Sequence, residues 1–347
     1  MNKSDAIATL NRPGGRPAAE YAELKRLVKQ QNITDRQPLF YSLTIVSILA
    51  IYVASFVAII LLDNLWLLLL DAAIMGFAFT HMGFLGHDAG HRQIFIKSKL
   101  NDITSLSVAF LMGTGRSWWV NQHNEHHTNP NDLDLDPHTA IPILAYSKEV
   151  ASQKKGILRL IIRYQAIYFF PILVGEGLGM RLAAIQYMLK SKMKYPVLEP
   201  VLMGLHFVIY FAMLALFLEP IHAVLFFIVH QACFGFYMGS IFAPNHKGMP
   251  TITKESKLDF IRRQVLTSRN ITPGILTDFW YGGLNYQIEH HLFPTIPRNK
   301  LKETRKVVKQ FCRDHSIPYH ETNVFKAQWE ILSSLHEFSA PLRAKGA

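Results

Sequence analysis

Seven histidines of this 347-residue chain fall in three short clusters. These clusters are His87-Asp88-Ala89-Gly90-His91, His123-Asn124-Glu125-His126-His127 and Gln287-Ile288-Glu289-His290-His291. Residues spaced i, i+3 and i+4 share one face of a helix, so each cluster can direct its imidazoles at one point. Imidazole is a good ligand for iron, zinc, copper and nickel. Seven imidazoles exceed the four ligands of a structural zinc, and the clusters therefore predict two metal ions.

Chance explains the clusters poorly, because one HxxHH arises in only about a few per cent of chains with this histidine content. Isolated histidines are interpreted differently. His206 and His222 lie on apolar segments and are expected to be packed or interfacial, and His81 is off the helical face of the first cluster. His138 is a weaker metal candidate, and His230 is expected to bond backbone in the last apolar stretch, or to touch a ligand.

The composition indicates the elements that must position these histidines. Half of the residues are hydrophobic, only 18% are charged, and the mean hydropathy is +0.13, which is too apolar for an ordinary soluble enzyme. Cys233 and Cys312 form neither a disulfide framework nor a CxxC metal site. About forty mostly polar residues precede the first apolar stretch, so we expect no signal peptide.

Four apolar stretches are each long enough to cross the roughly 30 Å hydrocarbon core of a bilayer as a helix. The sequence predicts an all-α integral membrane fold, with four transmembrane helices in two hairpins and a cytoplasmic helical cap that holds a histidine-rich dimetal site. The predicted spans are 40–62, 65–85, 197–217 and 221–243.

The basic residues predict the orientation of these hairpins. All 36 lie in 1–39, 86–196 and 244–347, and the outer turns Asp63-Asn64 and Leu218-Glu219-Pro220 contain none. The positive-inside rule then places both termini and all three clusters in the cytoplasm, at the inner membrane if the source is bacterial. The net charge of +11 is interpreted as orientation and contact with anionic lipid, with no nucleic-acid partner.

Three shorter segments are expected near the membrane surface. Residues 103–115 are too short to span and predict a re-entrant or interfacial piece. Residues 156–175 carry Arg159 and Arg163 in an apolar run, as expected of a helix lying in the interface. Residues 299–314 predict a basic amphipathic helix. We divide the chain into a cytoplasmic N-terminal segment (1–39), a membrane domain (40–315) and a cytoplasmic C-terminal tail (316–347).

The extended strings around the clusters resemble those of the integral-membrane fatty acid desaturases, over roughly residues 40–315. These strings are Gly86-His87-Asp88-Ala89-Gly90-His91-Arg92, Asn124-Glu125-His126-His127-Thr128-Asn129-Pro130 and Gln287-Ile288-Glu289-His290-His291-Leu292-Phe293-Pro294. Gln287 at the start of the third box resembles the subgroup that contains front-end desaturases and several bacterial acyl desaturases.

The resemblance implies an oxygen-dependent enzyme that introduces a cis double bond into a long acyl chain, carried by acyl-CoA or acyl-lipid. Such an enzyme uses two iron ions (Fe2+) with molecular oxygen as co-substrate, and no catalytic residues are expected beyond the metal ligands. A histidine just beyond the last span belongs to the family pattern, and His246 matches it. The implied ligands are His87, His91, His123, His126, His127, His246, His290 and His291.

Other residues are expected around the ligands. Acids within the clusters can accept an imidazole N–H, although surface ion pairing is a nearly equal alternative for each. Aromatic residues before the second and third boxes would line an acyl tunnel or anchor the chain at the membrane interface. The alternating Asp132, Asp134 and Asp136 lack the Gly and Glu of a calcium loop, which excludes that interpretation. The possible supporting residues are Gln287, Asn245, Asp88, Glu125 and Glu289, and the possible tunnel residues are Trp118, Trp119, Trp280 and Tyr281.

Desaturation needs two electrons from outside, and the chain has no dinucleotide fingerprint and no cysteine cluster. We therefore expect no bound flavin or haem, and a separate donor of ferredoxin or cytochrome type with its reductase. The nearest alternative is a membrane di-iron hydroxylase of alkyl, acyl or sphingolipid chains. A zinc protease would need HExxH, which is absent. A non-catalytic lipid-binding or metal-binding protein is the third alternative.

Overall fold

The computed structural model describes residues 17–344, so part of the predicted N-terminal segment (1–16) and the last residues of the predicted tail (345–347) lie outside the described residues. The chain divides into two compact units. Unit 1 comprises 1–35, 122–169 and 241–347, and unit 2 comprises 36–121 and 170–240. Three of the four boundaries between them fall inside helices, namely α6 (Arg116–Thr128), α9 (Gln165–Leu173) and α12 (Pro220–His246), and the fourth, at 35/36, lies between helices.

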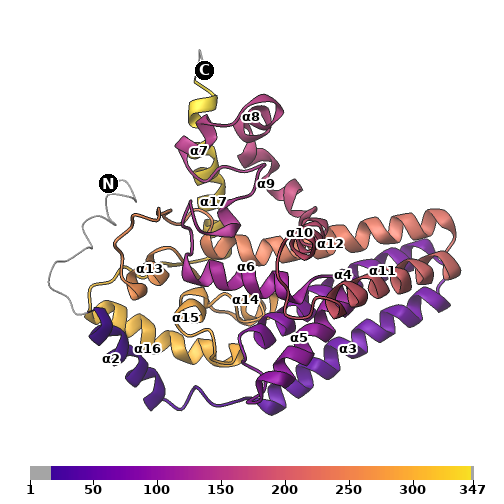
Figure 1. The fold of residues 1–347 in the computed structure, drawn as a ribbon, viewed down its shortest axis with the longest axis horizontal. Helices are drawn as coiled ribbons and strands as arrows, with labels where there is room; N and C mark the ends of the chain where they lie inside the picture. The colour runs from indigo at the N-terminus through magenta and orange to yellow at the C-terminus, as the bar shows by residue number, and fades with distance from the viewer. Residues whose placement is uncertain (1–16, 345–347) are drawn as a thin grey trace. The chain divides into compact units, whose positions relative to one another are not determined.

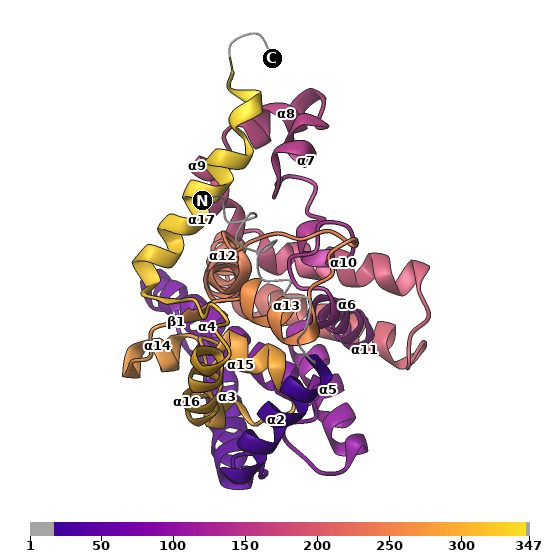
Figure 2. The same cartoon turned by 90° about the vertical axis from the view of Figure 1, so that its left-hand side faces the viewer.

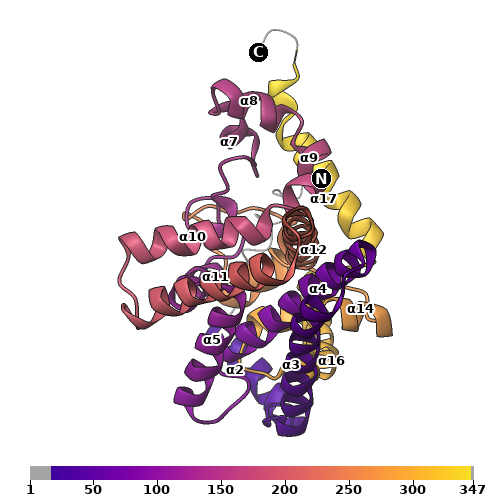
Figure 3. The same ribbon diagram turned by 90° about the vertical axis from the view of Figure 1, so that its right-hand side faces the viewer.

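Unit 2 is helical throughout its described elements. Its helices α3, α4, α5 and α11 pack on one another, and Figures 1 and 3 show them side by side. The helices that lie wholly in unit 2 are α3 (Pro38–Leu61), α4 (Leu65–Gly90), α5 (Ser98–Met112), α10 (Glu176–Lys190) and α11 (Leu198–Phe217).

The first hairpin of unit 2 follows from its sequence. Pro38 occupies the start of α3, where its missing N–H costs no hydrogen bond. Asn64 caps α4, because its side-chain oxygen accepts the backbone N–H groups of Trp66 and Leu67 at 3.0 and 3.2 Å. The turn between the two helices is therefore short, as the sequence predicts.

Four described helices are long and apolar enough to cross a membrane, namely α3, α4, α11 and α12. This agrees with the four predicted spans. The helices α4 and α12 continue beyond the predicted apolar stretches, to Gly90 and His246. Backbone hydrogen bonding does not depend on side-chain polarity, so a helix can continue from the apolar stretch into the histidine-bearing segment. The first box thereby starts on the last turn of α4.

The structure confirms the helix predicted at 299–314 and corrects the single helix predicted at 156–175, while the interfacial position of 103–115 stays a prediction. The segment 103–115 falls mainly in α5, which is 15 residues long, and 299–314 is mainly α16 (Leu301–Asp314). The segment 156–175 is instead two helices, α8 (Gly156–Arg163) and α9, bent by 94°. Tyr164 leaves the helical backbone conformation between them. Gln165 then bonds the backbone of Ala145 and the carbonyl of Leu335, which holds the bend.

Unit 1 is built around a core in which α2, α13, α15 and α16 meet (Figure 2). Leu24, Ile261, Ile288 and Phe311 are buried there, one from each helix. Full burial of such a side chain contributes about 1.5–3 kcal/mol, so this core holds the third-box helix α15 in place. The remaining elements of unit 1 are α2 (Pro17–Gln30), η1 (Pro137–Thr139), α7 (Lys148–Ser152), α13 (Phe260–Leu266), α14 (Ile275–Trp280), α15 (Gln287–Leu292), η2 (Arg298–Lys300), α17 (Val324–Phe338) and η3 (Ala340–Leu342).

Two short strands, β1 (Asn270–Ile271) and β2 (Glu321–Thr322), pair in parallel within unit 1. Asn270 lies opposite Glu321, and Ile271 lies opposite Thr322. Helix α14 follows β1 and helix α17 follows β2, so the pair fixes where both helices begin.

Candidate metal centre

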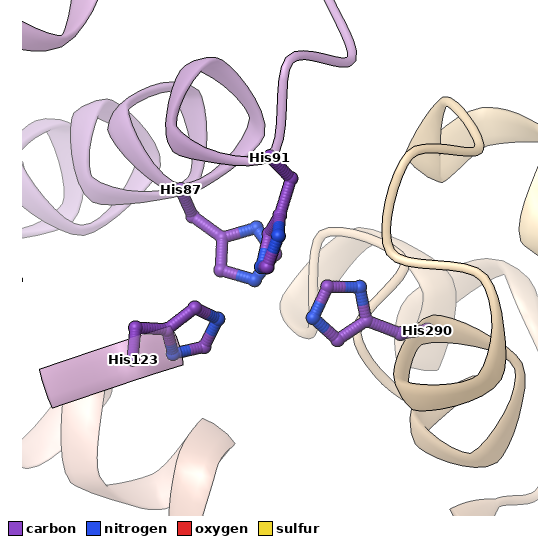
Figure 4. Close-up of side chains that lie close together, drawn as sticks. All are labelled: His87, His91, His123 and His290. Atoms are coloured by element: carbon purple, nitrogen blue, oxygen red, sulfur yellow. The ribbon is translucent and has the colours of Figure 1, made fainter. Parts of the chain in front are cut away.

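The first box supplies a pair of buried histidines in unit 2. His87 lies in the last turn of α4, and His91 is the residue that ends the helix. Their ring centroids are 4.7 Å apart, and the edge of Trp119 lies against both rings. Burial, together with the nearby His87, lowers the pKa of His91 well below its usual value, which favours the neutral form that ligates metals. Figure 4 shows both imidazoles projecting from the end of α4.

The second box lies on the part of α6 that belongs to unit 1. His123 and His127 are one helical turn apart, and their Nε2 atoms are 3.0 Å from each other. The ring of His290, from α15, lies 4.7 Å from the His127 ring and 6.1 Å from the His123 ring. Figure 4 shows His123 and His290 on these two elements. The second and third boxes therefore converge within unit 1.

Three further imidazoles of unit 1 form a tight group, which we call the histidine trio: His126, His246 and His291. One ligand atom from each lies within 4.8 Å of the others, and His126 Nε2 is 3.2 Å from His246 Nε2. All three side chains are buried, with no more than 5% of their surface exposed. They come from α6, the end of α12 and α15, so separate segments converge on one point.

An oxygen acceptor lies opposite the Nδ1 atom of each histidine in the trio. His126 Nδ1 is 2.9 Å from a carboxylate oxygen of Asp136, and His246 Nδ1 is 3.1 Å from the carbonyl oxygen of Thr267. His291 Nδ1 is 2.8 Å from Gln264 Oε1. The amide nitrogen of Gln264 donates to the carbonyl of His127 at 3.0 Å, which confirms that the oxygen faces His291.

These contacts test whether the trio fits a metal ion. A carboxylate or carbonyl oxygen can only accept, so each Nδ1 carries the proton and each Nε2 keeps its lone pair. The Nε2 atom of His291 is buried and has no hydrogen-bond partner among residues 17–344. The Nε2 atoms of His126 and His246 lie 3.2 Å apart, so their lone pairs repel, and a cation bound among the three rings would relieve this repulsion. The donor set therefore fits a transition metal that accepts imidazole ligands.

Gln287 and Asn245, both predicted as supporting residues, lie beside the trio. The side-chain nitrogen of Asn245 donates to Gln287 Oε1 at 3.0 Å. This bond turns the amide nitrogen of Gln287 toward His246 Nε2, at 3.0 Å. Gln287 therefore presents a hydrogen-bond donor to the site, and an amide N–H does not ligate metals.

Asp136 is a functional candidate that the sequence interpretation missed. Besides His126, its carboxylate accepts the backbone N–H groups of Asn131 and His138, each at 2.9 Å. Burial raises its pKa, but the facing His126 and the nearby His138 and Lys247 outweigh burial, and the pKa lies well below its usual value. The signal in the sequence is the acidic alternation of residues 132–136, one member of which supports a histidine instead of belonging to a calcium loop.

The other acids within the boxes are placed differently from one another. Asp88 Oδ1 lies 3.2 Å from His87 Nδ1, as a supporting carboxylate would. Glu125 is exposed, and among residues 17–344 its carboxylate accepts no hydrogen bond from a box histidine. Glu289 is buried and accepts from Asn270 and Tyr319 at 2.6 and 2.8 Å, while burial raises its pKa to about 7.

The predicted tunnel aromatics do not share one environment. Trp119 lies against the first-box histidines, and Trp118 beside it on α6 is partly buried. Tyr281 is 1% exposed, whereas Trp280 on α14 is 41% exposed. His138, the weaker metal candidate, stacks on His126 with the ring centroids 4.4 Å apart. Burial and the neighbouring His126 lower the pKa of His138 to about 3.

Comparison with known proteins gives the same family as the histidine boxes. The model of the fatty acid desaturase family matches residues 64–323. A Delta(6)-fatty-acid desaturase of Caenorhabditis elegans is 32% identical over 80% of this chain and 66% of its own length. An acyl-lipid (9-3)-desaturase of Physcomitrium patens is 27% identical over 92% of this chain and 62% of its own length.

A third relative, a Delta(5) fatty acid desaturase of Caenorhabditis elegans, is 30% identical over 89% of this chain and 71% of its own length. The chain thus spans somewhat less than two thirds of the length of the first two relatives. The family match itself covers most of the chain and includes all three histidine boxes and His246. On this ground the chain is a member of the membrane fatty acid desaturase family.

Proposed function

We propose that this protein is an oxygen-dependent fatty acyl desaturase that introduces a cis double bond into a long acyl chain. The observation that carries the proposal is the histidine trio, in which each Nδ1 faces an acceptor and the three Nε2 lone pairs converge. Its relatives are named for desaturation of fatty acids or acyl-lipids, which supports the same reaction class.

Two iron ions are the proposed cofactors, held by the eight histidines of the boxes and the end of α12. The trio would hold one ion, and its contacts within unit 1 support this part of the assignment. The remaining ligands that the family resemblance implies are His87, His91, His123, His127 and His290. An unactivated C–H bond offers neither an acidic proton nor an electrophilic carbon, and the metal centre supplies the oxidant that it requires.

The protein's own contribution to this chemistry is orientation and exclusion of water. Asp136, the Thr267 carbonyl and Gln264 fix the ring orientation and tautomer of the trio, which raises the basicity of the Nε2 atoms. Burial of the trio keeps bulk water away from the reacting atoms. The substrate is an acyl chain, which apolar surroundings accommodate. Hydrocarbon and oxidant would therefore meet in a dry environment.

Electrons would come from a separate donor, a ferredoxin or cytochrome with its reductase. The termini and the histidine boxes would lie on the cytoplasmic side, with the two short turns of the hairpins outside. The distribution of basic residues supports this orientation. A donor on the cytoplasmic side would then reach the metal centre without crossing the membrane.

The direct test is to express the chain in a host and analyse the fatty acid methyl esters by gas chromatography and mass spectrometry. A new unsaturated product is expected, and it should disappear in the His291→Ala variant. His222→Ala is the matched control, because His222 lies near the start of α12, outside the proposed ligand set, and should leave the product unchanged. A new hydroxylated product without a double bond would contradict the proposal and favour a hydroxylase.

A further inference from the structure

The helices α14 and α17 of unit 1 begin at the same end of the strand pair. Strands β1 and β2 run parallel, and the backbone N–H of Thr272 also donates to the Thr322 carbonyl at 2.8 Å. Helix α14 begins at Ile275 and helix α17 at Val324, each a few residues beyond its strand. Figure 2 shows α14 and the first turns of α17 near β1. Side chains from the two helix starts can therefore contribute to one surface.

Large apolar side chains on these two helices are exposed, and we call them the apolar edge. On α14, Ile275 is 90% exposed, Leu276 is 82% exposed and Phe279 is 57% exposed. On α17, Phe325 is 87% exposed and Trp329 is 69% exposed, and their i, i+4 spacing places them on one face. Soluble surfaces seldom leave such a set of large apolar groups in water, so the apolar edge indicates a contact surface.

Another face of α14, which carries Asp278, contacts the rest of unit 1. The carboxylate of Asp278 accepts the side-chain N–H of Asn285 at 2.8 Å and the hydroxyl of Tyr286 at 2.7 Å. Tyr286 directly precedes α15, the helix that carries His290 and His291. The hydrogen bonds of Asp278 therefore join α14 to the segment that leads into the third histidine box.

Helix α17 is attached to the end of α12, one of the helices apolar enough to cross a membrane. This attachment indicates the level of α17 relative to the membrane surface. Gly248 lies two residues beyond α12 with φ +82°, and a Cβ atom there would approach the Glu330 carbonyl oxygen to 2.7 Å. The guanidinium of Arg269 donates to the carbonyls of Pro244 and Lys247 and to the Glu330 carboxylate. Glu330 is the neighbour of Trp329, so the apolar edge lies close to the level at which the span ends.

We infer that the apolar edge inserts into the interface of the bilayer that α12 crosses, between the lipid headgroups and the acyl chains. Trp and Phe side chains favour this depth, and the end of a span is where it begins. Lys326, exposed between Phe325 and Trp329 in sequence, suits contact with lipid phosphates. The contact would hold unit 1 against the membrane surface, close to the acyl chains on which a desaturase acts.

Trp329 is itself the probe of this inference. We would reconstitute the full-length protein in vesicles of phosphatidylcholine with or without dibrominated acyl chains, and measure tryptophan quenching by the brominated lipid and by aqueous iodide. The chain has five tryptophans, so the contribution of Trp329 is the difference between the wild type and Trp329→Phe. Trp66→Phe serves as the matched reference, because Trp66 is 76% exposed at the start of the membrane-spanning α4.

The expected result is that the Trp329 component is quenched by brominated lipid about as strongly as the Trp66 component and is shielded from iodide. Phe325→Ser should reduce the lipid quenching of Trp329 by loosening the same edge. Quenching of Trp329 by iodide but not by lipid would overturn the inference. Shielding from both quenchers would also overturn it, because that outcome requires a protein partner on the apolar edge.

Discussion

Buried histidines in the two units differ in what lies opposite their Nδ1 atoms. In the trio of unit 1, each Nδ1 faces an oxygen that can only accept a hydrogen bond. In unit 2, His230 Nδ1 faces the Tyr210 hydroxyl at 2.7 Å and the Gln231 amide nitrogen at 3.2 Å. The oxygen of Gln231 is bonded by Arg181, so the nitrogen that faces His230 is a donor.

The difference decides which ring nitrogen can bind a metal. His230 Nδ1 accepts hydrogen bonds, so its Nε2 carries the proton and has no lone pair to offer. The Phe79 ring lies edge-to-face with this imidazole, 4.4 Å away between centroids, as expected for packing. Burial and histidine content alone do not identify a metal ligand. A metal ligand is identified by the chemistry of the group opposite its second ring nitrogen. Removing one histidine from each group tests this comparison.

The largest effect is expected from removing a member of the trio. His291→Ala deletes one of three converging Nε2 atoms, so desaturated product should fall below detection and bound iron should fall from two ions to about one per chain. His230→Phe, the matched change in unit 2, should keep both iron ions and lower only the thermal unfolding midpoint. Product analysis and metal analysis of the same preparations provide the check. Equal iron loss in the two variants would remove the distinction between the groups.

The next effect concerns Asp136, which holds the Nδ1 proton of His126. Asp136→Ala should weaken metal binding by about 10- to 100-fold, the usual effect of removing a carboxylate that supports a ligating histidine. Asp134→Ala is the control, because the Asp134 carboxylate accepts the backbone N–H of Lys254 at 3.2 Å and lies outside the trio. Chelator competition measures the affinity. Unchanged affinity in Asp136→Ala would show that the carboxylate does not support the metal site.

A smaller effect of the same kind is expected at Gln264. Gln264→Leu removes the acceptor from His291 Nδ1 and frees the imidazole to rotate, so iron affinity should fall by about 10-fold, the low end of the range for such contacts. Gln264→Glu keeps an oxygen opposite Nδ1 and should retain most of the affinity. If Gln264→Glu lost more iron affinity than Gln264→Leu, the assignment of the proton to His291 Nδ1 would be contradicted.

The smallest effect is a pH dependence of stability in unit 2, where buried polar groups join segments of the chain. Asp102 contacts Arg92, Arg116 and Lys194 at 2.5–2.6 Å. Burial raises the pKa of Asp102, but the three cations outweigh burial and lower it from 3.8 to about 2. The ionised form is therefore stabilised by folding, and this contribution is present above about pH 4 and lost as the pH falls toward 2.

In thermal unfolding scans, Asp102→Asn should lower the midpoint near neutral pH and flatten its decline between about pH 4 and 2. Iron content at neutral pH should stay at the wild-type level, because the cations that Asp102 contacts lie outside the proposed ligand set. A variant that unfolds with the wild-type pH profile would show that the ion pairs add nothing to stability.

Much of the fold was predictable from the sequence because membrane spans depend on length and apolarity, which are local properties. Asn64 and Pro38 likewise act on their own helix ends. The bend at Tyr164 was not predictable, since Gln165 holds it through contacts with residues far along the chain.

The residues of the candidate metal site likewise fall into those that local sequence spacing predicts and those that it does not. Helical spacing predicted the box histidines, and the family resemblance added His246. Asp136 and Gln264 were missed, because each meets its histidine through the tertiary fold rather than through helical spacing. Glu125 shows the converse, since it lies inside a box and yet is exposed.

The central claim is that the eight histidines hold two iron ions that perform desaturation. Metal analysis of purified, catalytically active protein tests it most directly, with each element measured per chain. The account predicts two iron ions per chain in the wild type, with activity lost in proportion when iron is removed by a chelator and recovered when Fe2+ is returned. An active preparation that contains zinc and no iron would contradict it.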